Sequence, residues 1–311
     1  MDYARLHGLC PQSYEHPSDK KTLDALQSQS GIETLIRKFN EFGVDRLLRI
    51  QLMGSYLRAT EDSFPGLYRA VRESCEILDL PKRPSVYIQP GGLNAFTAGV
   101  EQPIVVLNAG LIDAMTEQEL RFVVGHELGH IKSGHVLYYQ VAMLLPVLAE
   151  MLGTATLGIG ALLSLPLEVA LIRWQRMSEL TADRAGLLAC QDINAATTAM
   201  IKLAGLPAKF FDQVNPDDFL AQAREFEAFD SDKLDWMAKI LSGVGESHPW
   251  TVMRGSELLR WVDSNQYEKI LADPRQPMGA AAGSSAKVFC TSCGAPVSGA
   301  FCSACGARVK A

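Results

Sequence analysis

The sequence has few features of a secreted or nucleic-acid-binding protein. Its first 21 residues contain no apolar run of the kind found in secretory signal peptides, so we expect no such leader. The formal net charge of −6 gives no general attraction to nucleic acid or anionic lipid. Seven cysteines, an odd number, suit a reducing compartment better than a disulfide framework. We therefore expect a cytoplasmic protein without nucleic-acid partners.

Apolar residues recur at helical spacing over most of the chain. Residues 1–20 are polar, and we expect them to be loosely ordered. Residues 21–80 have an apolar period near 3.6, which predicts amphipathic helices. The β-rich runs at 85–89 and 103–110 enclose a turn-rich stretch and predict a small sheet. The expected fold class is therefore α+β and mainly α-helical.

Three of the six histidines lie close together in "RFVVGHELGHIKSGH", residues 121–135. A capping-box pattern predicts that a helix begins at Thr116 and carries them. On a helix, His126 and His130 lie about 40° apart on one face, so two imidazoles can bind one zinc ion. Glu127 lies beside them and can act as a general base toward water. This is the HExxH pattern of zinc proteases.

The third histidine does not fit the same face. His135 follows His126 by nine residues, which places it roughly on the opposite side if the helix continues. The longer HExxHxxGxxH pattern also fails, because Ser133 and Val136 occupy the positions of its glycine and third histidine. We therefore expect the third zinc ligand to come from elsewhere in the chain.

A pair of carboxylates in "RMSELTADRAG" supplies that ligand. Glu179 and Asp183 are four residues apart, which is about one turn of the helix expected there. We predict that Glu179 binds the zinc and that Asp183 accepts a hydrogen bond from a ligating histidine, which fixes its tautomer. The alternative is a solvent-exposed helix in which Arg176 and Arg184 pair with these carboxylates. The upstream HExxH motif favours the metal site.

Four motifs, in this order, resemble a known family. They are "NAFTAG" at 94–99, "GHELGH", "RMSELTADRAG" and "SHPWTVMR" at 247–254. The pattern is similar to the HtpX-type and CAAX-prenyl-protease-type gluzincin zinc metallopeptidases, family forty-eight of the metallopeptidases, over roughly residues 65–262. The resemblance implies the ligand set His126, His130 and Glu179, with Glu127 as the general base.

The same resemblance implies further site residues. His248 would stabilise the oxyanion or position the substrate, and Arg254 would have a supporting role close to the substrate. Asn94, at the start of "NAFTAG", is a candidate on the substrate side. Polypeptides are the substrates that the family implies, with a role in protein quality control.

An unusually apolar stretch follows the histidines. We expect a helical hairpin over residues 136–173, called the apolar hairpin below, in which Glu150 and Glu168 are the only acidic residues. Because His130 and Glu179 must meet at one metal, this segment crosses a bilayer twice or not at all. Two crossings would leave spans of about 17 residues, the minimum length. Two prolines and the two glutamates favour a soluble or peripheral hairpin, docked on the catalytic helices, a membrane surface or a partner.

The C-terminal region contains a second metal-binding pattern. Residues 273–287 are expected to form a flexible linker before a zinc ribbon at 288–311. The ribbon has a CxxC-x8-CxxC pattern, in which four thiolates close a tetrahedral structural zinc site. It would fold only with metal and could dock a protein partner or serve as an ordered tail. The four ligands are Cys290, Cys293, Cys302 and Cys305.

These patterns predict a zinc metalloendopeptidase with one catalytic and one structural zinc ion. An N-terminal helical region at 1–64 would precede the metallopeptidase domain at 65–272. We expect an extended peptide to add to a sheet edge at 103–108. The alternatives are a holdase without enzymatic activity and a zinc hydrolase of a non-peptide substrate. The presence of Glu127 favours an enzyme, because binding alone needs no base.

Overall fold

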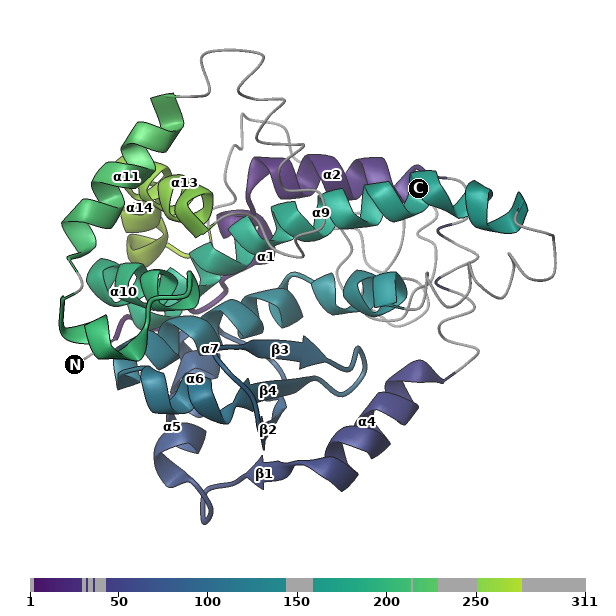
Figure 1. Ribbon diagram of the computed structural model, residues 1–311, viewed down its shortest axis with the longest axis horizontal. Helices are drawn as coiled ribbons and strands as arrows, with labels where there is room; N and C mark the ends of the chain where they lie inside the picture. The colour runs from purple at the N-terminus through teal and green to yellow at the C-terminus, as the bar shows by residue number, and fades with distance from the viewer. Residues whose placement is uncertain are drawn as a thin grey trace.

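Two long helices form the centre of the molecule. In the computed structural model, α7 (Glu117–Lys132) lies beside α9 (Ile159–Cys190), with the sheet on one side of the pair and α2 (Pro17–Gln27) along α9 on the other (Figure 1). Because α7 carries the histidines and α9 the carboxylates, this pairing builds the candidate site. The residues that the structure describes are 3–29, 32, 36, 43–143, 159–213, 215–228 and 251–275.

The sheet has four short strands in the order β1-β2-β4-β3. β2 (Ser85–Gln89) and β4 (Ile104–Asn108) are parallel and confirm the two strands predicted from the sequence. β3 (Ala95–Ala98) pairs antiparallel with β4, and β1 (Leu57–Ala59) pairs antiparallel with β2. β3 occupies the stretch expected to be turns, and β1 lies in the region expected to be helical, so both were missed.

The position of β4 changes the predicted substrate edge. β4 lies between β2 and β3, so both of its edges are already paired. It is also buried along its whole length. The expectation that a peptide adds at residues 103–108 is therefore wrong. Among the described strands, the sheet ends at β1 and at β3, and β3 contacts α7.

The remaining helices surround this centre, and the predicted fold class, α+β and mainly α-helical, is confirmed. α5 packs against α7, while α10, α11, α13 and α14 gather at one end of the molecule (Figure 1). Their bounds are α1 (Pro11–Tyr14), α4 (Val44–Ser55), α5 (Pro65–Ile77), α6 (Ala109–Ala114), α10 (Ile193–Leu203), the 3₁₀ helix η1 (Ala208–Gln213), α11 (Pro216–Ala228), α13 (Thr251–Asp263) and α14 (Gln266–Ala272).

Residues 3–20 are part of the folded core, so the loose order expected of residues 1–20 is wrong for the residues of this segment that the structure describes. Leu6 and Tyr14 are fully buried, in the same hydrophobic cluster as residues of α7 and α9. α2 begins at Pro17, where the missing amide of proline costs no hydrogen bond. The His16 side chain caps the helix by accepting a hydrogen bond from the Ser18 amide. A few apolar side chains among polar neighbours are enough to anchor the segment.

The apolar hairpin is described only in part. The chain is helical over residues 135–143, and the second arm is the first half of α9, which continues unbroken to Cys190. Leu137 and Leu171 pack with Leu26 of α2 in one buried cluster. Residues 144–158 lie outside the described residues. Within the part of the chain that the structure describes, no helix combines the length and apolarity needed to cross a membrane. The choice between a spanning and a peripheral hairpin stays a prediction.

Candidate metal centre

The helix that carries the histidines begins where the sequence predicts. The Thr116 hydroxyl accepts a hydrogen bond from the Glu119 amide at 3.3 Å, and the Glu119 carboxylate accepts one from the Thr116 amide at 2.7 Å. This reciprocal pair is a capping box. Lys202 of α10 donates to the same carboxylate at 2.7 Å. The start of α7 is thus fixed from two sides, which fixes the face on which His126 and His130 lie.

Two glycines of "GHELGH" let α9 approach α7 closely. A Cβ atom on Gly125 would lie 2.3 Å from Cβ of Ala189, and one on Gly129 would lie 2.6 Å from Cβ of Ala185. Carbon atoms pack best at about 3.5–4.0 Å, so neither position has room for a side chain at this helix separation. Glu179 precedes these two alanines on α9, and the close contact between the helices brings its carboxylate within reach of both histidines.

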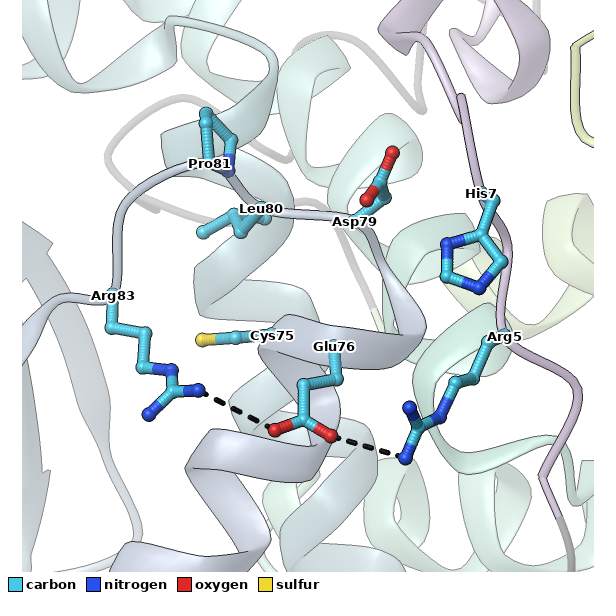
Figure 2. Close-up of a pocket in the computed structure, with 8 residues that line it drawn as sticks. All are labelled: Arg5, His7, Cys75, Glu76, Asp79, Leu80, Pro81 and Arg83. Carbon is cyan, nitrogen blue, oxygen red and sulfur yellow. Dashed lines mark hydrogen bonds and ion pairs between the residues drawn. The ribbon is translucent and has the colours of Figure 1, made fainter.

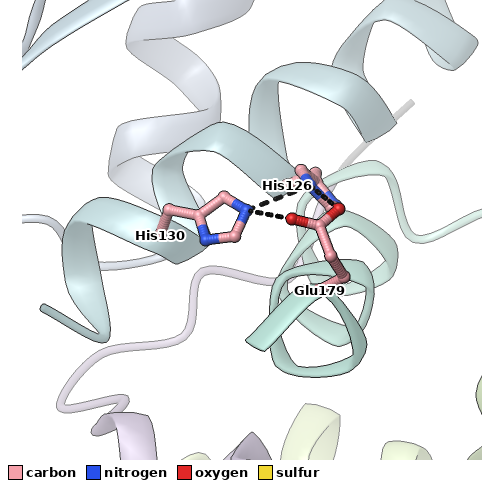
Figure 3. Close-up of side chains that lie close together, drawn as sticks. All are labelled: His126, His130 and Glu179. Carbon is pink, nitrogen blue, oxygen red and sulfur yellow. Dashed lines mark hydrogen bonds and ion pairs between the residues drawn. The ribbon is translucent and has the colours of Figure 1, made fainter. Parts of the chain in front are cut away.

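His126, His130 and Glu179 converge from the two helices (Figure 3). All three are buried. The two Nε2 atoms are 3.2 Å apart, and the Glu179 carboxylate oxygens lie 3.5 Å from Nε2 of His126 and 3.3 Å from Nε2 of His130. Bonds of about 2.1 Å in a tetrahedral zinc site separate neighbouring ligand atoms by about 3.4 Å. Two imidazoles and one carboxylate at these separations therefore fit a zinc ion.

Asp183 and Arg254 lie behind His126. Oδ1 of Asp183 is 2.9 Å from Nδ1 of His126, so the imidazole can donate from Nδ1 while Nε2 faces the site. Arg254 of α13 donates to both Asp183 oxygens, at 2.6 and 2.8 Å, and its guanidinium is 3.5 Å from Glu179. Burial would raise the pKa of Asp183, but Arg254 and His126 outweigh it and lower that pKa. The carboxylate is thus charged.

The structure therefore excludes the solvent-exposed alternative for these carboxylates. Glu179 and Asp183 are each 1% exposed. Arg184, one of the two expected surface partners, is itself buried and donates to the main-chain oxygens of Tyr14 and Glu15. Both acids face the interior between α7, α9 and α13.

Glu127 is held by the sheet. Its carboxylate accepts a hydrogen bond of 2.7 Å from the Thr97 hydroxyl, and the same hydroxyl lies 3.2 Å from the Glu127 main-chain oxygen. Thr97 belongs to β3, so this strand runs beside the active-site helix at the candidate metal centre. Glu127 is 6% exposed and lies next to the ligands without being one of them. It can receive a proton there.

Tyr139 is a residue at the site that the sequence did not reveal. Its hydroxyl donates to Oε1 of Glu179 at 2.5 Å, and its ring packs edge-on against His130 at a centroid distance of 5.1 Å. Burial, together with the charge of Glu179, raises the pKa of Tyr139, so the phenol stays a donor. It was missed because it lies in the apolar hairpin. The available signal in the sequence was a tyrosine, with its polar hydroxyl, in an apolar stretch only four residues after His135.

His135 does not lie on the opposite face of the helix, so this prediction is wrong. α7 ends at Lys132, and Gly134 adopts a left-handed conformation with φ +73° that turns the chain back. As a result Nδ1 of His135 lies 3.0 Å from Nδ1 of His130. His135 is outside the group of converging ligand atoms, as predicted, but it touches one of the ligands.

The other predicted site residues fall into two groups. Asn94 is exposed just before β3, where its main-chain oxygen accepts a hydrogen bond from the Asn108 amide, and a contact with substrate stays a prediction. Arg254 lies behind the ligands, where it donates to Asp183, and this fits a supporting position. The rest of the predicted residues lie outside the described part of the chain, namely His248, most of the linker and the four ribbon cysteines.

A separate hollow lies between the N-terminal segment and the end of α5 (Figure 2). Its volume is about 290 Å³, and it shares no residue with the metal centre. Arg5 and Arg83 both pair with Glu76 there, at 3.3 and 3.4 Å. Burial raises the pKa of the Cys75 thiol to about 12, so this cysteine is not a nucleophile at neutral pH. The hollow has no evident chemistry.

Comparison with known proteins places this site in a family. Residues 62–262 match the model of peptidase family M48. The plastoglobule-localized metallopeptidase 48 of Arabidopsis thaliana is 31% identical over 274 residues, which cover 85% of this chain and 76% of the relative. The protease HtpX homolog 2 of Methanosarcina mazei is 28% identical over 193 residues, covering 55% and 64%, and the protease HtpX homolog of Burkholderia cenocepacia is 30% identical over 172 residues, covering 47% and 60%. No solved structure matches. Since the family model spans more than half of the sequence and contains the His-His-Glu cluster, the chain belongs to peptidase family M48, a family of metallopeptidases.

Proposed function

We propose that the chain is a zinc-dependent endopeptidase that hydrolyses polypeptides with Glu127 as its general base. The observation that carries the proposal is the convergence of His126, His130 and Glu179 beside a carboxylate that is not itself a ligand. A site built only to hold a structural ion would need no such neighbour. Membership of a metallopeptidase family supports the same reading.

The side chains have separate tasks in this mechanism. A bound zinc ion would polarise the scissile carbonyl and acidify water. Glu127 takes the proton of the attacking water and later delivers it to the leaving amine. Thr97 orients the Glu127 carboxylate through the 2.7 Å hydrogen bond. Asp183, Arg254 and Tyr139 hold the ligands in place through the contacts described above.

The position of β3 supports an extended peptide as the substrate. This strand is at the end of the sheet and bears Thr97, which bonds the general base. An extended chain that pairs with such an edge satisfies its own backbone hydrogen bonds and lies along the active-site helix. Unfolded polypeptides offer backbone in this form, which agrees with a role in protein quality control.

Metal-dependent cleavage tests the proposal. The purified full-length chain should cleave unfolded casein, lose this activity with 1,10-phenanthroline, and regain it when zinc is added back. The His126→Ala variant should be inactive under all three conditions, because it lacks one of the two imidazole ligands. Binding of casein without cleavage by zinc-loaded protein would favour a holdase, and hydrolysis of ester but not peptide substrates would favour a different hydrolase.

We also propose that the four C-terminal cysteines bind a second, structural zinc ion. The full-length chain should then contain one zinc ion more than a chain that ends at residue 275, where the described residues end. Four thiolates around zinc leave no open position, so this ion should also exchange more slowly than the catalytic one. Metal analysis of both chains measures the difference, and equal zinc content would disprove the ribbon.

A further inference from the structure

The second ligating histidine has its own supporting pair, formed by Asp19 and His135. Nδ1 of His130 lies 3.0 Å from Nδ1 of His135, and Nε2 of His135 lies 3.1 Å from Oδ2 of Asp19. The three side chains are all at least nine-tenths buried. We propose that Asp19 and His135 are positioning residues that fix the tautomer and orientation of His130 in the zinc site. The inference rests on the proposed function of that site.

The hydrogen-bond directions follow from the acceptor at the end of the chain. Asp19 also accepts hydrogen bonds from the Thr181 hydroxyl at 2.5 Å and from the Trp174 indole at 3.1 Å, the pattern of an ionised carboxylate. Its third contact must therefore be a donor, the Nε2–H of His135. In neutral His135 the Nδ1 atom is then an acceptor. It receives the Nδ1–H of His130, which leaves the lone pair on Nε2 of His130 facing the metal.

The ring of His135 is also held sterically. Trp174 packs edge-on against it at a centroid distance of 5.6 Å, and the same indole donates to Asp19. Gly134 sets the direction from which His135 enters, because the chain turns back at that residue. His135 thus has little freedom to rotate away from His130. A fixed partner of this kind reduces the orientational freedom that a ligand loses when metal binds.

Each ligating histidine is consequently hydrogen-bonded, directly or through one other side chain, to a buried carboxylate. His126 contacts Asp183 directly, and His130 reaches Asp19 through His135. Asp183 is within the region that matches the family model, whereas Asp19 is on α2, outside residues 62–262. In this proposal α2 packs against the apolar hairpin and also supplies Asp19, which supports a zinc ligand.

Zinc affinity of matched variants tests the pair. The full-length chain is stripped of metal and titrated with zinc against a chelator, with the His126→Ala variant reporting sites elsewhere in the chain. His135→Leu should weaken the site by about 10–100-fold, the usual effect of losing such a partner. His135→Asn places an amide oxygen near the position of Nδ1 and should restore most of the affinity. His7→Leu, the same substitution at an exposed histidine outside the zinc site, is the control and should bind like the unchanged chain.

The tautomer of His135 gives a second test, which is measured on the unchanged chain and uses a variant only to assign the signal. A long-range ¹H–¹⁵N spectrum of the zinc-loaded chain should show His135 protonated at Nε2 and not at Nδ1, with the signal assigned by its loss in His135→Asn. This decides the matter even if His135→Leu does not fold. Protonation at Nδ1, or unchanged affinity in folded His135→Leu, would overturn the inference. Equal zinc binding by the unchanged chain and His126→Ala would overturn the zinc site itself, and the inference with it.

Discussion

Replacing Glu127 with glutamine should abolish most peptide hydrolysis while leaving zinc bound. Glutamine has nearly the shape of glutamate and can still accept the Thr97 hydrogen bond, but it cannot take up a proton from water. General-base catalysis contributes about 10²–10⁴-fold to rate, so kcat on unfolded casein should fall by at least about two orders of magnitude. Glu127 is outside the ligand group, so zinc content should not change.

The matched control is the same substitution at Glu117, on the same helix. Glu117 is largely exposed, with 64% of its side chain accessible, and the buried Arg121 with which it pairs keeps a second carboxylate partner in Glu73 at 2.8 Å. Glu117→Gln should keep full activity. If folded, zinc-loaded Glu127→Gln protein were as active as Glu117→Gln, in preparations free of contaminating protease, the general-base mechanism would be refuted.

Local spacing in the sequence was sufficient to predict the arrangement on α7. The interval between His126 and His130 fixes one helical face, and the capping box fixes where that helix begins. The strands predicted at 85–89 and 103–110 were likewise identifiable, because each is a short run rich in β-forming residues and turn residues separate the two. In each case the signal and the structure involve residues within a few positions of each other.

The contacts that complete the site have no local signal. Thr97 and Glu127 are separated by 30 residues, and Asp183 and Arg254 by 71. Which side chains meet depends on how closely α7 and α9 approach, and Gly125 and Gly129 set that distance only once both helices exist. His135 was misplaced for a related reason. A continuous helix was assumed, although a glycine in the left-handed conformation at position 134 ends it.

Removing Arg254 from its buried ion pair with Asp183 should strongly destabilise the fold. Replacing Arg254 with methionine removes the cation from a carboxylate that is only 1% exposed. Breaking a buried pair by removing one partner costs about 3–5 kcal/mol, because an uncompensated charge stays buried. The free energy of unfolding of the metal-free chain, measured in urea, should fall by this amount, and zinc affinity should fall with it because Asp183 no longer orients His126.

Arg260 provides the comparison on the same helix. Its side chain is 51% exposed and pairs with Glu257 at 2.6 Å, and exposed pairs contribute about 0–1 kcal/mol. Arg260→Met should therefore change stability little. The double variant Arg254→Met with Asp183→Asn should recover part of the loss, since the buried negative charge is gone, although His126 keeps only a weaker acceptor. If Arg254→Met were no more destabilising than Arg260→Met, the Arg254–Asp183 pair would not be what holds α13 and α9 together behind the metal ligands.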